Sequence, residues 1–317
     1  MLFRTFTRSL LQKTNRSKIC RVLSVSYARY NSDKNTFSTL SSCLHPDIID
    51  EFQENGAVCL RNVFDKHWQE VAHKGIEKCF NNPSEYCDWI IGEDGEGVYF
   101  NDYMNWEKVD EIKEYAFNSQ AAAIAGQLMK SNVSIFFHDH VFVKKGGKNR
   151  AAPWHHDQAY YPIDGMQNCT IWMPTTPVNK ETCLRFVKGS HLWQKWFHPK
   201  KFVSHLNYSL DTIDTFEYED IPEDIDDGTY EILTWDLQPG DCIAFHMKTL
   251  HATTKASATS PRYVIATRWL GDDAVYARRP WKSSPPQETL PKGLQLGANI
   301  STTKSFPIIW QKMMNTE

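Results

Sequence analysis

The sequence contains no long hydrophobic run and no strong excess of charge of one sign. None of its 317 residues lies in a stretch that approaches the roughly 20 apolar residues of a membrane-spanning helix, and the mean hydropathy is −0.52. The formal net charge is −3 and the pI about 6.5, so there is no basic field of the kind that nucleic acids or anionic membranes attract. We therefore expect no membrane span, no nucleic-acid partner and a small-molecule substrate.

The sequence also has no CxxC pair, no dense cysteine cluster and no internal repeat. Its eight cysteines are dispersed, which predicts free thiols in a reducing compartment rather than a disulfide scaffold. The length suits one large β-barrel with a substantial core and an N-terminal appendage. The oligomeric state is not predicted.

The first 32 residues contain no acidic side chain before Asp33. They carry seven basic residues, namely Arg4, Arg8, Lys13, Arg16, Lys18, Arg21 and Arg29. This composition is typical of a mitochondrial transit peptide, although a disordered basic tail is the alternative. We predict that residues 1–32 direct the chain to the mitochondrial matrix and that residues 33–317 form a single domain.

The pattern after residue 45 predicts a few helices followed by many short strands. Helices are expected at 46–55, 65–80 and 106–130, with a first strand at 57–60. Further strands are expected at 133–144, 169–173, 183–187, 230–235, 241–247, 250–254 and 262–269. Short, closely spaced strands indicate a sandwich or jelly-roll barrel, so we expect a mainly β fold with flanking helices.

His155 and Asp157 are the first candidate functional residues. In an extended chain alternate side chains share a face, so these two point toward one place while His156 points away. A histidine from another strand completes the 2-His-1-carboxylate triad, which leaves open coordination positions on Fe(II). His246 and His251 are both candidates for that third ligand, and spacing alone does not choose between them.

Arg262 begins the last strong strand, on the same face as Arg268. Because a guanidinium binds a carboxylate through two parallel hydrogen bonds, Arg262 is a natural anchor for the distal carboxylate of 2-oxoglutarate. The alternative for either arginine is an ion pair with a structural acid. A free Arg268 would favour a substrate with a carboxylate or phosphonate.

Residues 47–270 resemble the phytanoyl-CoA dioxygenase family of Fe(II)/2-oxoglutarate oxygenases. The matching segments are Phe52-x-x-Asn55-Gly56, Trp154-His155-x-Asp157-Gln158, Phe186-x-x-Gly189-Ser190-His191, and Gly240-Asp241 through His251 to Arg262. The sequence departs from the family pattern at Glu181-Thr182, where the family commonly has an Asn-Gly-like turn. The resemblance implies a double-stranded β-helix, a jelly-roll barrel of the cupin type.

The resemblance also implies roles for individual residues. The family's distal histidine lies eleven residues before its 2-oxoglutarate arginine, which selects His251 beside Arg262. A hydroxyl two residues after that histidine is matched by Thr253. Trp172 matches an aromatic beside the cosubstrate, and His140 matches a polar residue that often contacts it.

The chemistry implied is that of an enzyme that binds Fe(II), 2-oxoglutarate and O2, with ascorbate as a reductant. It yields succinate and CO2 and hydroxylates a small molecule, either an anionic or zwitterionic metabolite or an acyl compound. Related halogenating enzymes have a small residue in place of Asp157, so its presence favours hydroxylation. The alternatives are a protein or peptide hydroxylase with the same iron chemistry and a non-catalytic metal-binding jelly roll. Six aromatic residues are candidates for the substrate pocket: Tyr99, Phe100, Tyr103, Trp106, Tyr160 and Tyr161.

Overall fold

The computed structural model describes residues 44–92, 95, 97–146, 151–202, 204–209, 217–254, 260–303 and 306–312. The predicted transit peptide, residues 1–32, lies outside them. Within the described part of the chain no helix is long and apolar enough to cross a membrane. The six cysteines described there are free thiols, as predicted from their dispersed spacing.

One large antiparallel sheet forms the centre of the molecule. Its strands lie in the order β1 (Ala57–Leu60), β9 (Cys242–Phe245), β6 (Asn168–Pro174), β11 (Arg262–Leu270), β4 (Val133–Lys145), β3 (Val98–Tyr103) and β2 (Asp88–Ile91). The eighth strand, β13 (Ile308–Gln311), also pairs with β4. The long pairing of β11 with both β4 and β6 places β11 at the middle of the sheet.

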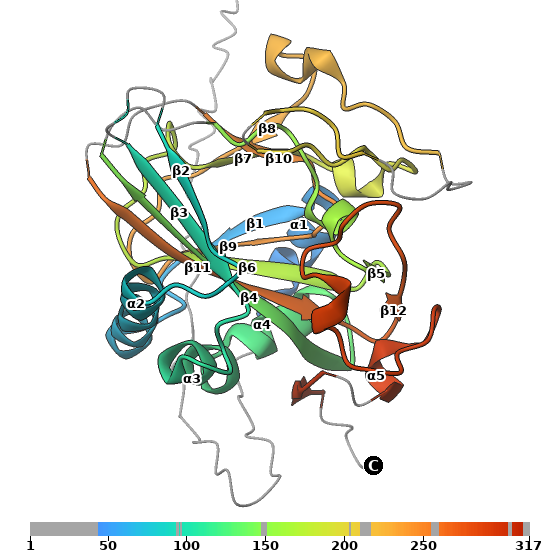
Figure 1. Cartoon of the computed structure of the whole chain (residues 1–317), viewed down its shortest axis with the longest axis horizontal. Helices are drawn as coiled ribbons and strands as arrows, with labels where there is room; N and C mark the ends of the chain where they lie inside the picture. Colours follow the sequence, from blue (N-terminus) through green and yellow to red (C-terminus); the bar gives the residue numbers. More distant parts are fainter. Residues whose placement is uncertain are drawn as a thin grey trace, which may run out of the picture.

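A smaller sheet lies across from the large one, near the top of Figure 1. It consists of β10 (His251–Thr253), β7 (Leu184–Val187) and β8 (Ile232–Leu233). A two-stranded ribbon of β5 (Ile163–Asp164) and β12 (Val275–Tyr276) lies to one side. Although the sheets do not close into a continuous barrel, the arrangement confirms the predicted double-stranded β-helix.

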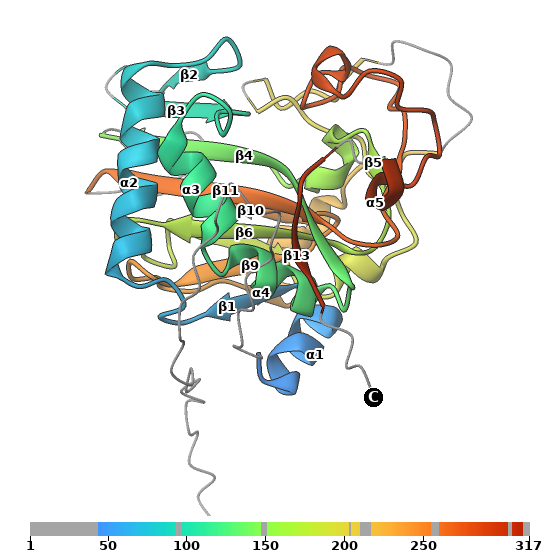
Figure 2. The same ribbon diagram turned by 90° about the horizontal axis from the view of Figure 1, so that it is seen from below.

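Helices cover the face of the large sheet that is turned away from the small one (Figure 2). They are α2 (Lys66–Asn81), α3 (Asp110–Asn118) and α4 (Ala121–Leu128), while α1 (Pro46–Asn55) precedes β1 and the short α5 (Ile300–Thr303) precedes β13. Asp65 caps α2 by accepting a hydrogen bond from the Trp68 N–H at 3.1 Å. Gly56 ends α1 in the left-handed conformation at φ 76°.

The single long helix expected at 106–130 is wrong, because the structure divides this segment into α3 and α4. Ser119 between them is extended, at ψ 175°, and its Oγ accepts a hydrogen bond from the Ala121 N–H at 3.3 Å. A serine that satisfies a backbone N–H in this way favours a break in the helix. The break lets the alanine-rich α4 lie buried against the sheet.

Alternation along the strands separates the helix side of the large sheet from the side that faces the small sheet. On β3, Phe100 is fully buried in the core under the helices, whereas its neighbours Tyr99 and Asn101 face the opposite side and line a cavity. Trp106 packs on Phe117 on the helix side. Of the six aromatics expected in the pocket, Phe100 and Trp106 are therefore wrong.

Candidate metal and cosubstrate site

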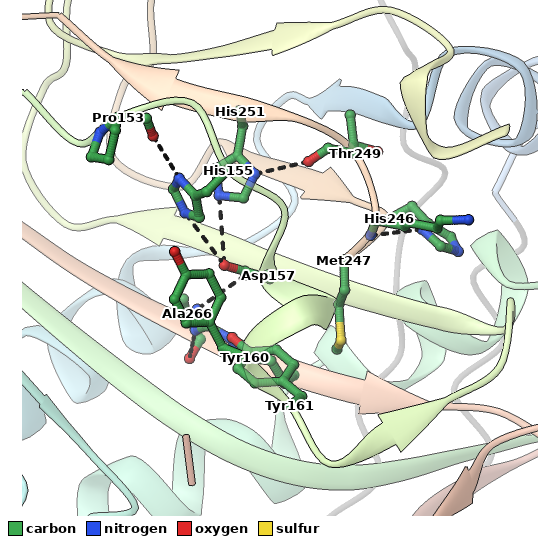
Figure 3. A network of polar contacts seen from close by, with 12 residues as sticks. Pro153, His155, Asp157, Tyr160, Tyr161, His246, Met247, Thr249, His251 and Ala266 are labelled. Carbon is green, nitrogen blue, oxygen red and sulfur yellow. Dashed lines mark hydrogen bonds and ion pairs between the residues drawn. The ribbon is translucent and has the colours of Figure 1, made fainter. Parts of the chain in front are cut away.

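His155, Asp157 and His251 converge between the two sheets (Figure 3). His155 and His251 are directly opposed in a β-bridge, with backbone N–H to O=C hydrogen bonds of 3.0 and 2.8 Å in the two directions. Asp157 begins the short 3-10 helix Asp157–Tyr160 immediately after this bridge. One ligand atom from each residue lies within 4.8 Å of the others, and all three side chains are buried.

The backbone fixes the orientation of both imidazole rings. The Nδ1 of His155 lies 2.8 Å from the carbonyl oxygen of Pro153, and the Nδ1 of His251 lies 2.9 Å from that of Thr249. A proton on Nδ1 satisfies each carbonyl and leaves Nε2 as a lone-pair donor. The Nε2 atoms then lie 3.6 and 3.7 Å from Asp157 Oδ1.

The protonation states also suit a metal ion. Burial alone raises the pKa of Asp157, but the neighbouring His155, His251 and Arg268 outweigh it and hold that pKa below its ordinary value. Burial, with the nearby His155, lowers the pKa of His251 to about 3. One carboxylate and two imidazole nitrogens on one side of a shared centre fit Fe(II) with open positions for other ligands.

Arg268 is engaged at this site, so the condition for a substrate anion at this position, a free Arg268 guanidinium, is not met. Its Nη2 lies 3.4 Å from Asp157 Oδ2, and its Nε donates a hydrogen bond to the Tyr161 hydroxyl at 3.0 Å. The side chain is buried. Arg268 thus follows the alternative reading of an arginine paired with an acid, and that acid is a candidate metal ligand.

The competing histidines lie elsewhere. His246 points its Nε2 at the carbonyl oxygen of Met166, 2.8 Å away, and its Nδ1 accepts a hydrogen bond from the Lys248 N–H at 3.0 Å. Figure 3 shows it beyond Met247, outside the converging cluster. His156 accepts a hydrogen bond from the Phe197 N–H, in keeping with its predicted turn away from the site.

A strongly basic region adjoins the cluster on β11 and β4. Arg262 pairs in register with Lys144, and both side chains are only 7% exposed. Arg262 donates from Nη1 to the carbonyl oxygen of Thr182, at the turn where the sequence departs from the family pattern. Within the described residues, neither Arg262 nor Lys144 has an acidic partner.

Lys144 was not among the site residues predicted from the sequence. Burial and the charge of Arg262 hold its pKa well below the ordinary value of 10.5, and its Nζ lies 5.0 Å from the centre of the Tyr99 ring. A lysine near the end of a long strand ordinarily suggests a solvated edge. The only signal was its alternation with His140 and Phe142, which places it on the cavity side of β4.

The three remaining predicted cosubstrate residues all line the same cavity. Trp172 is 5.8 Å from the Arg262 guanidinium, measured from its ring centre. Thr253 Oγ1 accepts a hydrogen bond from the Ala152 N–H at 2.8 Å. His140 stacks on Phe142 and its Nε2 lies 3.0 Å from Asn101 Oδ1.

The cavity that joins these groups has a volume of about 750 Å³. Its lining includes Arg262 and Lys144, the His-Asp-His cluster, and a rim that contains Asp88 and Lys282. Of the predicted pocket aromatics, it is lined by Tyr99, Tyr103, Tyr160 and Tyr161. Its size is ample for two small molecules, one at the basic region and one toward the rim.

A jelly roll with a buried two-histidine, one-carboxylate cluster defines the class of non-haem Fe(II) oxygenase folds. The chain matches the model of the phytanoyl-CoA dioxygenase (PhyH) family over residues 52–264, and it belongs to this family. The resemblance based on the sequence segments is thereby confirmed. No curated protein matches the chain.

Solved structures share the fold at low sequence identity. The non-haem α-ketoglutarate-dependent epimerase SnoN and carbocyclase SnoK, both from nogalamycin biosynthesis, are 20% and 18% identical, each with a TM-score of 0.63. The similarity covers 83% of this chain and 98% of SnoN, and 84% of this chain and 97% of SnoK. EctD from S. alaskensis is 12% identical, with a TM-score of 0.58 over 82% of this chain and 88% of its own. At these identities the similarity establishes the fold alone.

Proposed function

We propose that this protein is an Fe(II)- and 2-oxoglutarate-dependent dioxygenase that hydroxylates a small molecule, with release of succinate and CO2. The family and the His155–Asp157–His251 cluster support both cofactors. A structure of the relative SnoN contains Fe3+ and α-ketoglutarate. The sites proposed here are His155, Asp157 and His251 for iron and Arg262 with Lys144 for the cosubstrate.

The observation that carries the proposal is the pair of buried cations, Arg262 and Lys144, beside the cluster. A buried guanidinium beside a buried lysine is costly unless an anion binds between or beside them, and without that anion burial and the charge of Arg262 favour the neutral form of Lys144. The described residues supply no such anion. A dicarboxylate with one end at the metal and the other at Arg262 and Lys144 satisfies both requirements, because arginine binds a carboxylate through paired hydrogen bonds.

The remaining residues of the site hold its parts in place. The carbonyls of Pro153 and Thr249 keep both imidazoles in one tautomer, and Arg268 keeps Asp157 ionised. Trp172, which is buried, lies beside the Arg262 guanidinium at one side of the basic region. When bound, iron with 2-oxoglutarate supplies oxygen activation coupled to oxidative decarboxylation.

Two features favour hydroxylation of a small molecule. Asp157 keeps the carboxylate in the ligand set, at the position that a halide takes in related halogenating enzymes. The substrate region is part of a cavity of a size that suits a small molecule, with Tyr160 and Tyr161 among its buried walls. A non-catalytic jelly roll has no need of buried Arg262 and Lys144.

The direct test is succinate formation by the purified chain with Fe(II), ascorbate and 2-oxoglutarate, under air and under nitrogen. We expect oxygen-dependent succinate that is lost in Asp157→Ala, together with 2-oxoglutarate binding that is lost in Arg262→Met. A chain that binds iron at this site but shows no affinity for 2-oxoglutarate would contradict the proposal.

A further inference from the structure

The outer part of the cavity contains a carboxylate without a partner. Asp88 lies on β2 directly opposite Asn101 of β3, so both side chains share the face that lines the cavity. Asn101 in turn contacts His140 on β4. Within the described residues Asp88 makes no hydrogen bond and no ion pair. Its side chain is exposed at the rim, but partial desolvation and the charge of the nearby Asp102 raise its pKa.

Tyrosine rings line the same part of the cavity as this carboxylate. Tyr86 and Tyr103 stack at 5.4 Å on the same side of the cavity as Asp88, and Tyr208 lies on the opposing loop. Burial raises the pKa of Tyr208, and the negative charge of Asp88 raises it further. The same charge adds to the effect of burial on Tyr103. Asp88 therefore raises the pKa of both Tyr103 and Tyr208, which border the outer cavity.

The cations that line the cavity do not neutralise Asp88. Arg262 and Lys144 lie together on the neighbouring strands β11 and β4, and Arg268 is bound to Asp157. At the rim, Lys201 lies over the Tyr208 ring, with its Nζ 5.9 Å from the ring centre. Neither Lys201 nor Lys282, which also lines the rim, forms an ion pair with Asp88 among the described residues. The faces of Tyr86 and Tyr103 next to Asp88 have no such cation among the described residues. A carboxylate beside electron-rich ring faces favours a positively charged ligand.

We propose that the substrate carries an ammonium group, primary or quaternary, which binds between Asp88 and the rings of Tyr86 and Tyr103. This inference rests on the proposed function and names its substrate class. Among the expected substrates it replaces a purely anionic metabolite and agrees with a zwitterionic one, because Arg268 is bound to Asp157 and is not available to an anion.

The sheet order adds a constraint on the shape of this substrate. Strands β3 and β4 separate β2, which carries Asp88, from β11, which carries Arg268 beside Asp157. Three strand spacings amount to about 14 Å along the sheet. A molecule held at Asp88 and oxidised near Asp157 is therefore extended, with its charged group remote from the carbon that reacts.

The inference is tested by isothermal titration of the full chain with hexyltrimethylammonium and, as the matched anion, hexanoate. The titrations are made under nitrogen on the protein with Fe(II) and 2-oxoglutarate, and repeated on the metal-free protein. We expect the cation to bind at least about tenfold more tightly than hexanoate, and Asp88→Asn to remove about tenfold of that affinity. Asp224→Asn, at an exposed acid remote from the cavity lining, is the matched control and leaves the affinity unchanged.

Tyr86→Leu keeps an apolar side chain but removes the ring face, so it weakens binding of hexyltrimethylammonium and leaves binding of hexanoate unchanged. Equal or tighter binding of hexanoate, or unchanged cation affinity in both Asp88→Asn and Tyr86→Leu, overturns the inference. The 2-oxoglutarate titration is a separate arm of the experiment. Its failure would contradict the proposed function, whereas failure of the ammonium titration alone would contradict only the substrate class.

Discussion

Arg268 Nη2 approaches Oδ2 of Asp157 at 3.4 Å, while both histidine Nε2 atoms face Oδ1 of the same carboxylate. The two oxygens therefore have different environments. A cation on Oδ2 holds the carboxylate plane and leaves Oδ1 directed at the centre between His155 and His251. This division favours binding of the metal through one oxygen.

We expect Arg268→Ala to lower the affinity for Fe(II) or Co(II) by about tenfold to hundredfold, as is usual for loss of a group that orients a ligand. Arg268→Lys retains a positive charge and recovers part of the loss. Anaerobic titration calorimetry measures both. Unchanged metal affinity in Arg268→Ala, combined with loss of substrate-dependent turnover, would instead assign Arg268 to the substrate.

Lys144 predicts proton uptake when 2-oxoglutarate binds. Without the anion, burial and Arg262 hold the pKa of Lys144 well below 10.5. A bound carboxylate stabilises the ammonium form and raises that pKa. At a pH between the pKa values of the free and the bound state, Lys144 therefore takes up a proton when 2-oxoglutarate binds. Calorimetry in buffers of different ionisation enthalpy measures the uptake directly.

Lys144→Met should lose this proton uptake and bind 2-oxoglutarate at least about tenfold more weakly, as expected for loss of a charge-assisted contact. Lys108→Met, at an exposed lysine outside the cavity lining, is the control. Equal uptake in the wild type and Lys144→Met would show that another group takes the proton.

Asp139 predicts a specific dependence of stability on pH. It is fully buried in β4, where it accepts hydrogen bonds from the Asn105 and Trp106 N–H groups. Burial raises its pKa from 3.8 to about 6. The folded chain thus holds the Asp139 proton more tightly than the unfolded chain. Protonated Asp139 therefore contributes its full stabilisation of the fold below pH 3.8, and this contribution is lost as the pH rises through 6.

Relative to Asp139→Asn, the free energy of unfolding of the wild type should therefore fall between these two pH values, by about 1.4 kcal/mol per pH unit at most. Urea unfolding of both proteins across this range gives the difference directly. A constant difference would mean that Asp139 ionises alike in both states.

Residues 1–32 are predicted to act as a mitochondrial import signal. We expect a fluorescent protein fused after this segment to enter the mitochondrial matrix. Replacing Arg4, Arg8 and Arg16 by glutamate should abolish import, because the signal depends on a basic, acid-free composition. A fusion that remains outside mitochondria would leave the segment as a basic tail.

The sequence predicted the framework well where local signals were strong. The helices expected at 46–55 and 65–80 correspond to α1 and α2, and the strands expected at 250–254 and 262–269 carry His251 and Arg262. Strands β2 and β3 were missed. Trp89 and Ile91 of β2 are exposed, so this edge strand lacks the alternation of a half-buried strand.

The candidate site was predictable only in part, because several of its contacts depend on strand register. His155 and Asp157 are close in sequence, and their relation followed from alternation. Lys144 becomes relevant only because antiparallel pairing sets it opposite Arg262, 118 positions later in the sequence numbering. Likewise the partner of Arg268 could not be identified until Asp157 was placed above β11.

The β-bridge between His155 and His251 gives the site a framework of its own. Two backbone hydrogen bonds, of 3.0 and 2.8 Å, hold the histidines in place through the main chain. Zinc fingers differ, because their ligands come together only when the metal binds and chelators unfold them. Here a chelator should remove the metal while circular dichroism and the unfolding transition keep their native form, and reconstitution should need no refolding step.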